Sequence, residues 1–184
     1  ILDEGGGPLL IGFGAALGGL VEVPMMRSSS NLSERFGIRA VFMTGCVIYA
    51  LGFLLWGIVD DPQILSVLTF LEGVAFALVF TMSVVIVGKL VTPTLSSTGQ
   101  AVAATVGFGV APILGGLVGG WVYEHLGPAF LYGGASIVAL IACAIAYRAL
   151  DDPSLTQPQA TPELGAPPLG DLEPEPPKIG RAHV

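Results

Sequence analysis

Long apolar stretches separated by short polar connections fill the first 150 residues of the chain. Each stretch is long enough for an α-helix to cross the hydrocarbon core of a bilayer, which is about 30 Å thick and takes around 20 residues. Prolines and charged residues gather between the stretches, where helices end. The pattern therefore predicts five membrane-spanning helices, at residues 8–31, 38–59, 64–91, 99–124 and 129–150.

The composition agrees with a membrane protein. Of the 184 residues, 53% are hydrophobic and only 11% are charged, whereas an ordinary soluble domain has about 25% charged residues. Seven basic residues stand against 14 acidic ones, which leaves no basic patch to hold phosphate groups. We therefore expect an all-α membrane protein whose partner is the lipid bilayer and which binds no nucleic acid.

The basic residues of the apolar part fall at alternate connections between the predicted spans. Arg27, Arg35 and Arg39 surround the first connection, Lys89 precedes the third and Arg148 closes the last span. Connections rich in Lys and Arg stay on the cytoplasmic side of a membrane. This predicts a multi-pass protein of the cell's inner (plasma) membrane, with the N-terminus of the chain outside and its C-terminus in the cytoplasm.

The chain also divides into two unlike parts. Residues 151–184 hold eight of the 14 prolines, six acidic residues and few large apolar ones. Such a segment cannot bury enough surface to offset the entropy lost on ordering. We expect residues 1–150 to form a transmembrane bundle and residues 151–184 a disordered, acidic, cytoplasmic tail. Residues 179–184 resemble a translated sequencing adapter, so we expect them to be an artefact and the chain to be incomplete.

Two carboxylic acids lie inside the predicted spans and form the candidate chemical site. Glu72 is in the third span and Glu22 is in the first. An acid at membrane depth costs several kcal/mol unless it is neutral, paired or facing water, so it indicates substrate binding or proton coupling. The structural alternative is a neutral acid bonded to a neighbouring helix. Arg27 either reaches back to the interface or faces a cavity as an anion site.

Small residues recur at four-residue spacing along the fourth predicted span. In lipid there is little hydrophobic force between helices, so close backbone approach along such a stripe favours helix packing. Pro112 removes a backbone donor and is expected to bend this span, which leaves a flexible gating helix as the alternative. The stripe consists of Gly99, Ala103, Gly107, Ala111, Gly115 and Gly119.

Other chemistry has little support in the sequence. No grouping of His, Cys and carboxylate residues has metal-ligand spacing, and no Ser-His-Asp set or phosphate-binding glycine loop stands out. We therefore expect no metal, no cofactor and no enzymatic activity.

The connection after the first span resembles the short cytoplasmic hairpin of the major facilitator superfamily, which has the pattern G-x-L-x-D-R-x-G-R-R. Arg35, Gly37 and Arg39 match this pattern, and Glu34 stands in place of its aspartate. Over residues 9–150 the chain is similar to the C-terminal half of the lactose-permease-like branch, which includes the phenylpropionate permeases. The segments that carry this similarity are Val21–Pro24, Leu71–Gly73, Ser97–Ala101 and Tyr123–Gly127.

The resemblance implies that the five helices form most of one six-helix bundle of a twelve-helix carrier. The partners would then be the missing N-terminal half of the same carrier, a small-molecule substrate and protons. The implied function is proton-coupled symport of a small organic solute by a secondary active transporter. Two alternatives remain open: a non-transporting scaffold or receptor on the same fold, or the N-terminal half of an antiporter.

The predicted orientation is tested by thiol labelling. Single cysteines introduced by Asp61→Cys and His125→Cys should react with an impermeant thiol reagent added outside intact cells, because both connections lack basic residues. A cysteine introduced by Ser33→Cys should react only after the cells are permeabilised. The reverse pattern would refute the orientation.

Overall fold

The computed structural model describes residues 5–151, and within them every regular element is a helix. Five rods are long and apolar enough to cross a membrane, which confirms the all-α membrane fold. The predicted tail beyond Asp151, the segment thought to be an artefact and the first four residues lie outside the described part. The elements are α1 (Pro8–Phe36), α2 (Ile38–Ile58), α3 (Pro62–Leu90), η1 (Pro93–Leu95), α4 (Ser96–Ala104), the π-helical η2 (Thr105–Val110), α5 (Ala111–Leu126) and α6 (Pro128–Ala149).

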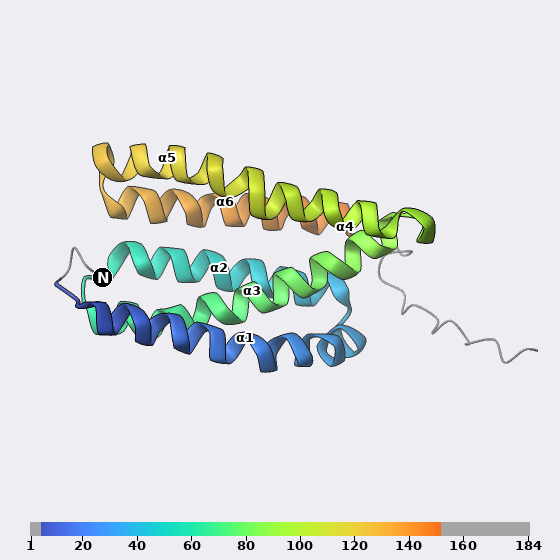
Figure 1. The fold of residues 1–184 in the computed structure, drawn as a ribbon, viewed down its shortest axis with the longest axis horizontal. Helices are drawn as coiled ribbons and strands as arrows, with labels where there is room; N and C mark the ends of the chain where they lie inside the picture. Colours follow the sequence, from blue (N-terminus) through green and yellow to red (C-terminus); the bar gives the residue numbers. More distant parts are fainter. Residues whose placement is uncertain (1–4, 152–184) are drawn as a thin grey trace, which may run out of the picture.

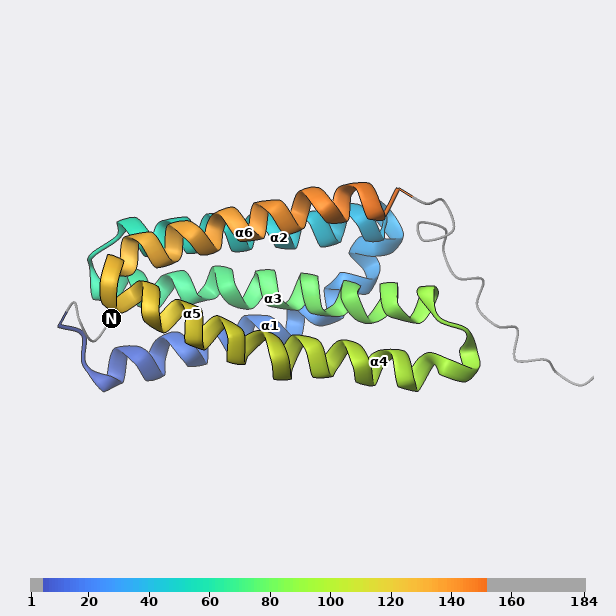
Figure 2. The ribbon, with the colours of Figure 1, turned by 90° about the horizontal axis from the view of Figure 1, so that it is seen from above.

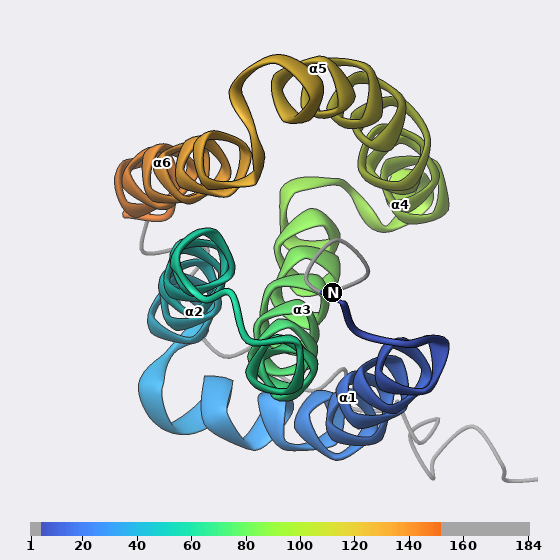
Figure 3. The same ribbon diagram turned by 90° about the vertical axis from the view of Figure 1, so that its left-hand side faces the viewer.

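The rods run side by side and alternate in direction (Figure 1). Helices α1, α2 and α3 form one layer, and the continuous rod from η1 to α5 forms the other together with α6. Seen from above, α3 runs along the middle of the molecule (Figure 2). Seen end-on, α3 lies between α1 and α2, while α4, α5 and α6 form an arc over them (Figure 3). Helix α3 therefore holds the first layer together.

The first connection is shorter than the sequence indicates. Helix α1 continues to Phe36, five residues beyond the predicted end, and Gly37 alone separates it from α2. The hydroxyls of Ser28 and Ser29 donate to carbonyl oxygens one turn earlier, at 2.8 and 2.7 Å. This bonding satisfies both hydroxyls within the helix itself. Gly37 adopts a φ of 85°, where an L side chain is strained, so the hairpin turn is this single residue.

The basic residues gather at one end of the bundle, as the sequence predicts. Arg35, Lys89 and Arg148 lie in the last turns of α1, α3 and α6. Arg39, in the first turn of α2, donates to the carboxylate of Asp151. The Arg39 guanidinium carbon also lies 3.9 Å from the centre of the Tyr147 ring. Arg39 therefore ties the start of α2 to the end of α6.

Helices α1 and α3 approach each other through small residues. The Thr69 hydroxyl donates to the Gly14 carbonyl oxygen at 2.7 Å. A Cβ added at Gly73 would overlap the backbone of Gly18, including its carbonyl oxygen. Backbones this close gain dispersion contacts and interhelical hydrogen bonds, which are what joins helices in lipid.

The apolar core lies between α2 and α3, toward the end of the bundle where α1 meets α2. Gly45 on α2 faces Leu78 and Val79 on α3 so closely that an added Cβ would lie 2.7 Å from a Val79 methyl group. The fully packed side chains of the core are Ile38, Val41, Leu78 and Met82.

This packing predicts a position-dependent response to alanine. Gly73→Ala should lower the free energy of unfolding by about 1–3 kcal/mol, because α1 must move away from the new methyl group. Gly88→Ala is the matched control on the same helix, since nothing lies within 4 Å of its added Cβ. It should be neutral or stabilise by about 0.5–1 kcal/mol. Reversible unfolding in mixed detergent micelles measures both, and equal effects would contradict the packing argument.

Candidate functional site

Glu22 and Glu72, the two acids singled out in the sequence, line the same cavity. This carboxylate cavity has a volume of about 430 Å³ and lies between α1 and α3. Its wall includes the aromatic residues Tyr49, Trp56 and Phe76. The structure thus brings together two acids that are 50 residues apart in the chain.

The glycine contact between α1 and α3 explains this arrangement. Glu22 lies one helical turn beyond Gly18, and Glu72 directly precedes Gly73. Because Gly18 and Gly73 meet at the crossing of the helices, both acids are held beside it. Within the described residues neither carboxylate has a hydrogen-bond or ion-pair partner in the chain. They are therefore available to protons, water or a solute.

Arg27 does not join this cavity. Its side chain is exposed on α1 and is absent from the lining of the carboxylate cavity. At about 100° per residue, five residues place Arg27 roughly 140° around the helix from Glu22. The spacing alone therefore points the two side chains in different directions.

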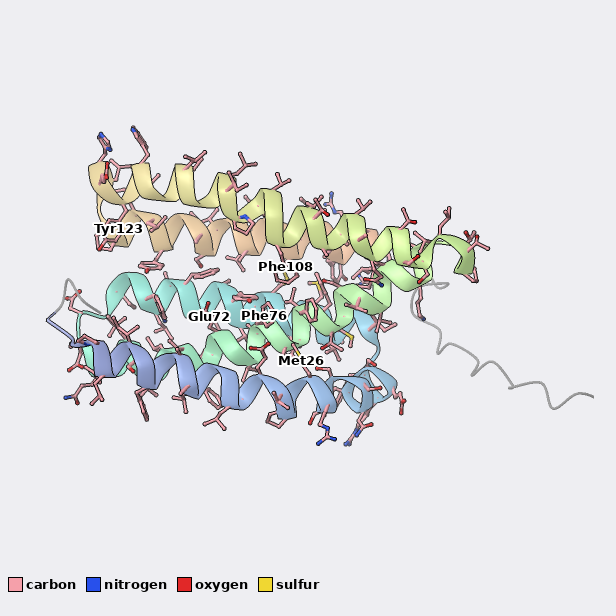
Figure 4. All side chains as sticks on the ribbon, viewed as in Figure 1. Met26, Glu72, Phe76, Phe108 and Tyr123 are labelled. Atoms are coloured by element: carbon pink, nitrogen blue, oxygen red, sulfur yellow. The ribbon has the colours of Figure 1, made fainter. Side chains whose placement is uncertain are left out.

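A second cavity, the aromatic cavity, lies between α3 and the fourth rod and has a volume of about 460 Å³. The rings of Phe76 and Phe80 are stacked, with their centres 5.4 Å apart. Phe108, from η2, meets both rings edge to face, at 6.4 and 5.8 Å. Figure 4 shows Phe108 reaching from its layer toward Phe76, with Glu72 farther along α3. Tyr49 and Phe76 line both cavities, which therefore share a wall.

The aromatic residues are the part of the site that the sequence analysis missed. A signal was present on α3, because Glu72, Phe76 and Phe80 recur every four residues and such residues share one helix face. Tyr49 and Phe108 had no comparable signal. Their contributions depend on how α2 and the fourth rod pack against α3.

The stripe of small residues is divided among several environments. Ala103 and Gly107 line the aromatic cavity, while Gly99 packs against Val87 and Val91 of the α3 region. Two further members differ sharply, since a Cβ at Gly119 would touch Leu131 and one at Gly115 would touch nothing within 4 Å. Ala111 begins α5 directly after the π-helical turn. A role in helix packing along the whole stripe thus remains a prediction.

The hairpin residues lie at the basic end of the bundle. Glu34 and Arg35 belong to the last turn of α1, Gly37 forms the turn, and Arg39 begins α2. The guanidinium carbon of Arg35 lies 5.3 Å from the centre of the Phe36 ring. These residues shape the end of the bundle and are separate from the two cavities.

Five apolar helices of spanning length, three of which line a cavity with two carboxylates, define a multi-pass membrane protein. The chain belongs to the MFS_1 like family, whose family model matches residues 2–133. This match confirms membership of the major facilitator superfamily and leaves the lactose-permease-like branch untested.

Two relatives from Bacillus subtilis (strain 168) agree with this family. The chain is 23% identical over 139 residues to the "Multidrug transporter protein MdtP". This alignment covers 76% of this chain and 26% of the relative. The chain is 28% identical over 101 residues to the "Uncharacterized MFS-type transporter YfkF". This second alignment covers 55% of this chain and 26% of the relative. The matched regions thus span about a quarter of each relative's length. No solved structure gives a significant match.

The carboxylate cavity predicts a pattern of thiol reactivity. With Cys46 and Cys143 replaced by Ala, cysteines introduced by Glu22→Cys and Glu72→Cys should react with a water-soluble methanethiosulfonate, because a hydrated cavity supports the reactive thiolate. Ile141→Cys is the control, since Ile141 is exposed on α6 and lines neither cavity. In lipid bilayers the cysteine at this control position should react at least about tenfold more slowly than the two cysteines in the cavity. Equal rates at the three sites would refute a hydrated site.

Proposed function

We propose that the chain is part of a secondary active transporter that couples the symport of a small organic solute to protons, with Glu72 and Glu22 as the coupling and binding groups. The observation that carries this proposal is the placement of both acids in one cavity between α1 and α3. Neither has a cationic partner among the described residues. Acids at membrane depth are costly unless they are neutral, paired or facing water.

A carboxyl group in such a cavity can take up a proton from one side of the membrane and release it on the other. Carriers of this kind bind substrate near the middle of the bilayer and expose the site to each side in turn. Glu72 is the first candidate for the proton-carrying group, because it lies well inside the long apolar helix α3 and lines the carboxylate cavity. Glu22 then faces the same solute or proton from α1.

The relatives support the carriage of solutes. One of them is named a multidrug transporter protein, and we extend from that name only the general idea of an organic solute. Since the matched regions span about a quarter of each relative, we infer that further helices complete the carrier. These include a span before α1 and a second bundle, which together make twelve helices in the plasma membrane.

The packing of the fourth rod supports this inference. On α1, Gly14 and Gly18 lie against α3, whereas added Cβ atoms at Gly115 and Gly116 of the fourth rod would meet nothing within 4 Å. An apolar rod whose small residues lack neighbours suits the close approach of another helix. We propose that the chain belongs to the C-terminal half of the carrier, and the N-terminal half of an antiporter is the alternative.

Replacing Glu72 tests the coupling. In proteoliposomes of the complete carrier, Glu72→Gln should abolish uphill accumulation of a transported solute under a pH gradient, because an amide cannot release a proton. Downhill exchange of the same solute should survive, since binding and reorientation do not require the proton to leave. Glu124→Gln is the control, because Glu124 lies near the end of α5 and outside the carboxylate cavity.

Normal uphill accumulation by the Glu72→Gln variant would make Glu72 a structural acid and move the coupling role to Glu22. If Glu22→Gln and the double variant also accumulate solute normally, proton coupling at these acids is wrong. Loss of downhill exchange in Glu72→Gln would instead assign Glu72 to solute binding.

A further inference from the structure

We propose that the aromatic cavity binds the apolar ring of the transported solute, and that Phe108 is the residue that selects for this ring. The inference rests on the proposed transport function and specifies its substrate class. The solute would be a small amphipathic compound with an uncharged aromatic ring and a polar group at one end.

The lining of the aromatic cavity contains no charged residue. Two of its polar side chains already bond to the protein's own backbone: the Gln100 amide donates to the Val84 carbonyl oxygen at 2.8 Å, and the Ser83 hydroxyl donates to the Val79 carbonyl oxygen at 2.7 Å. The third, Tyr49, belongs to the wall shared with the carboxylate cavity. A polyhydroxylated or charged group entering here would lose water without gaining replacement bonds, which costs several kcal/mol. The cavity therefore favours an apolar occupant.

The ring geometry makes that occupant aromatic rather than simply apolar. Phe76 and Phe80 present stacked rings, and Phe108 meets them edge to face. Another aromatic ring extends such a cluster with favourable contacts that a saturated chain lacks. The volume of about 460 Å³ lies within the range of roughly 300–1,000 Å³ for small-molecule sites.

The wall that the two cavities share determines where the polar group of the solute lies. Tyr49 and Phe76 separate the aromatic cavity from the carboxylate cavity and line both. A ring seated against Phe76 can extend a short substituent past this wall toward Glu72. The substituent that suits unpartnered carboxylates is one that donates a hydrogen bond, such as a hydroxyl group.

Phe108 enters the aromatic cavity from the irregular, π-helical part of the fourth rod. The Ala111 N–H donates to the Val106 carbonyl oxygen, five residues back, which is a π-helical bond. Pro112 has no N–H and its ring would crowd the Phe108 carbonyl in a regular α-helix, and the wider turn relieves this crowding. Such turns often occur at functional sites.

Binding measurements on the complete carrier test this proposal without using transport. The probe is 2-phenylethanol, an uncharged ring compound with one hydroxyl group, and the comparison compound is methyl β-D-galactopyranoside. Saturation-transfer NMR in lipid nanodiscs, with empty nanodiscs subtracted, should show saturable binding of 2-phenylethanol and little of the galactoside. Phe108→Ala and Phe80→Ala should each weaken it about tenfold. Phe130→Ala is the matched control, because Phe130 is exposed on α6, away from the cavity.

Phe108→Leu addresses folding, since it keeps an apolar side chain and removes only the ring. It should weaken 2-phenylethanol binding while leaving the thermal unfolding midpoint unchanged. Unchanged affinity in Phe108→Leu and Phe80→Ala, or preferential binding of the galactoside, would overturn the proposal. Failure of proton coupling would appear separately, as normal uphill accumulation by Glu72→Gln with ring binding intact.

Discussion

The close approach of α1 and α3 is the contact on which the rest of the described structure depends. In a bilayer the lipid tails are as apolar as leucine, so helices associate through dispersion contacts and hydrogen bonds rather than through the hydrophobic effect. Gly18 meets Gly73 with no room for a Cβ, and the Ser66 hydroxyl donates to the Leu10 carbonyl oxygen across the same contact at 2.7 Å. This crossing fixes the rotation of both helices about their axes. That rotation orients the side chains of Glu22 and Glu72 toward the same cavity.

The two cavities divide the chemistry of the site according to the cost of burial. Of the two, only the carboxylate cavity is lined by acidic residues, where the glycine-rich faces of α1 and α3 meet. On the other side of Tyr49 and Phe76, the aromatic cavity offers rings and almost no free polar group. A proton and an apolar ring can therefore occupy neighbouring places without sharing one environment. This separation suits the coupled transport of an amphipathic solute that we propose.

The fourth rod is the least regular and most sparsely packed element of the described chain. It contains a π-helical segment between α4 and α5, and none of its membrane-spanning residues is fully buried by the rest of the structure. By contrast, α2 is held to α6 by the hydrogen bond from Ser136 to the Ala50 carbonyl oxygen and by Arg39 with Asp151. Irregular helical turns of this kind often mark functional sites, which agrees with the place of Phe108 in η2.

The sequence by itself determined the five spans, the gathering of basic residues at one end and the two acids at membrane depth. These features depend on local hydropathy and charge, which a membrane imposes on each span separately. The tertiary structure decided which helices meet. It placed Gly18 of α1 at the tightest contact, left Gly115 of the small-residue stripe without a neighbour, and brought Tyr49 and Phe108 to the site. Helix rotation and packing partners arise from contacts between distant segments, so the residues along one span cannot specify them.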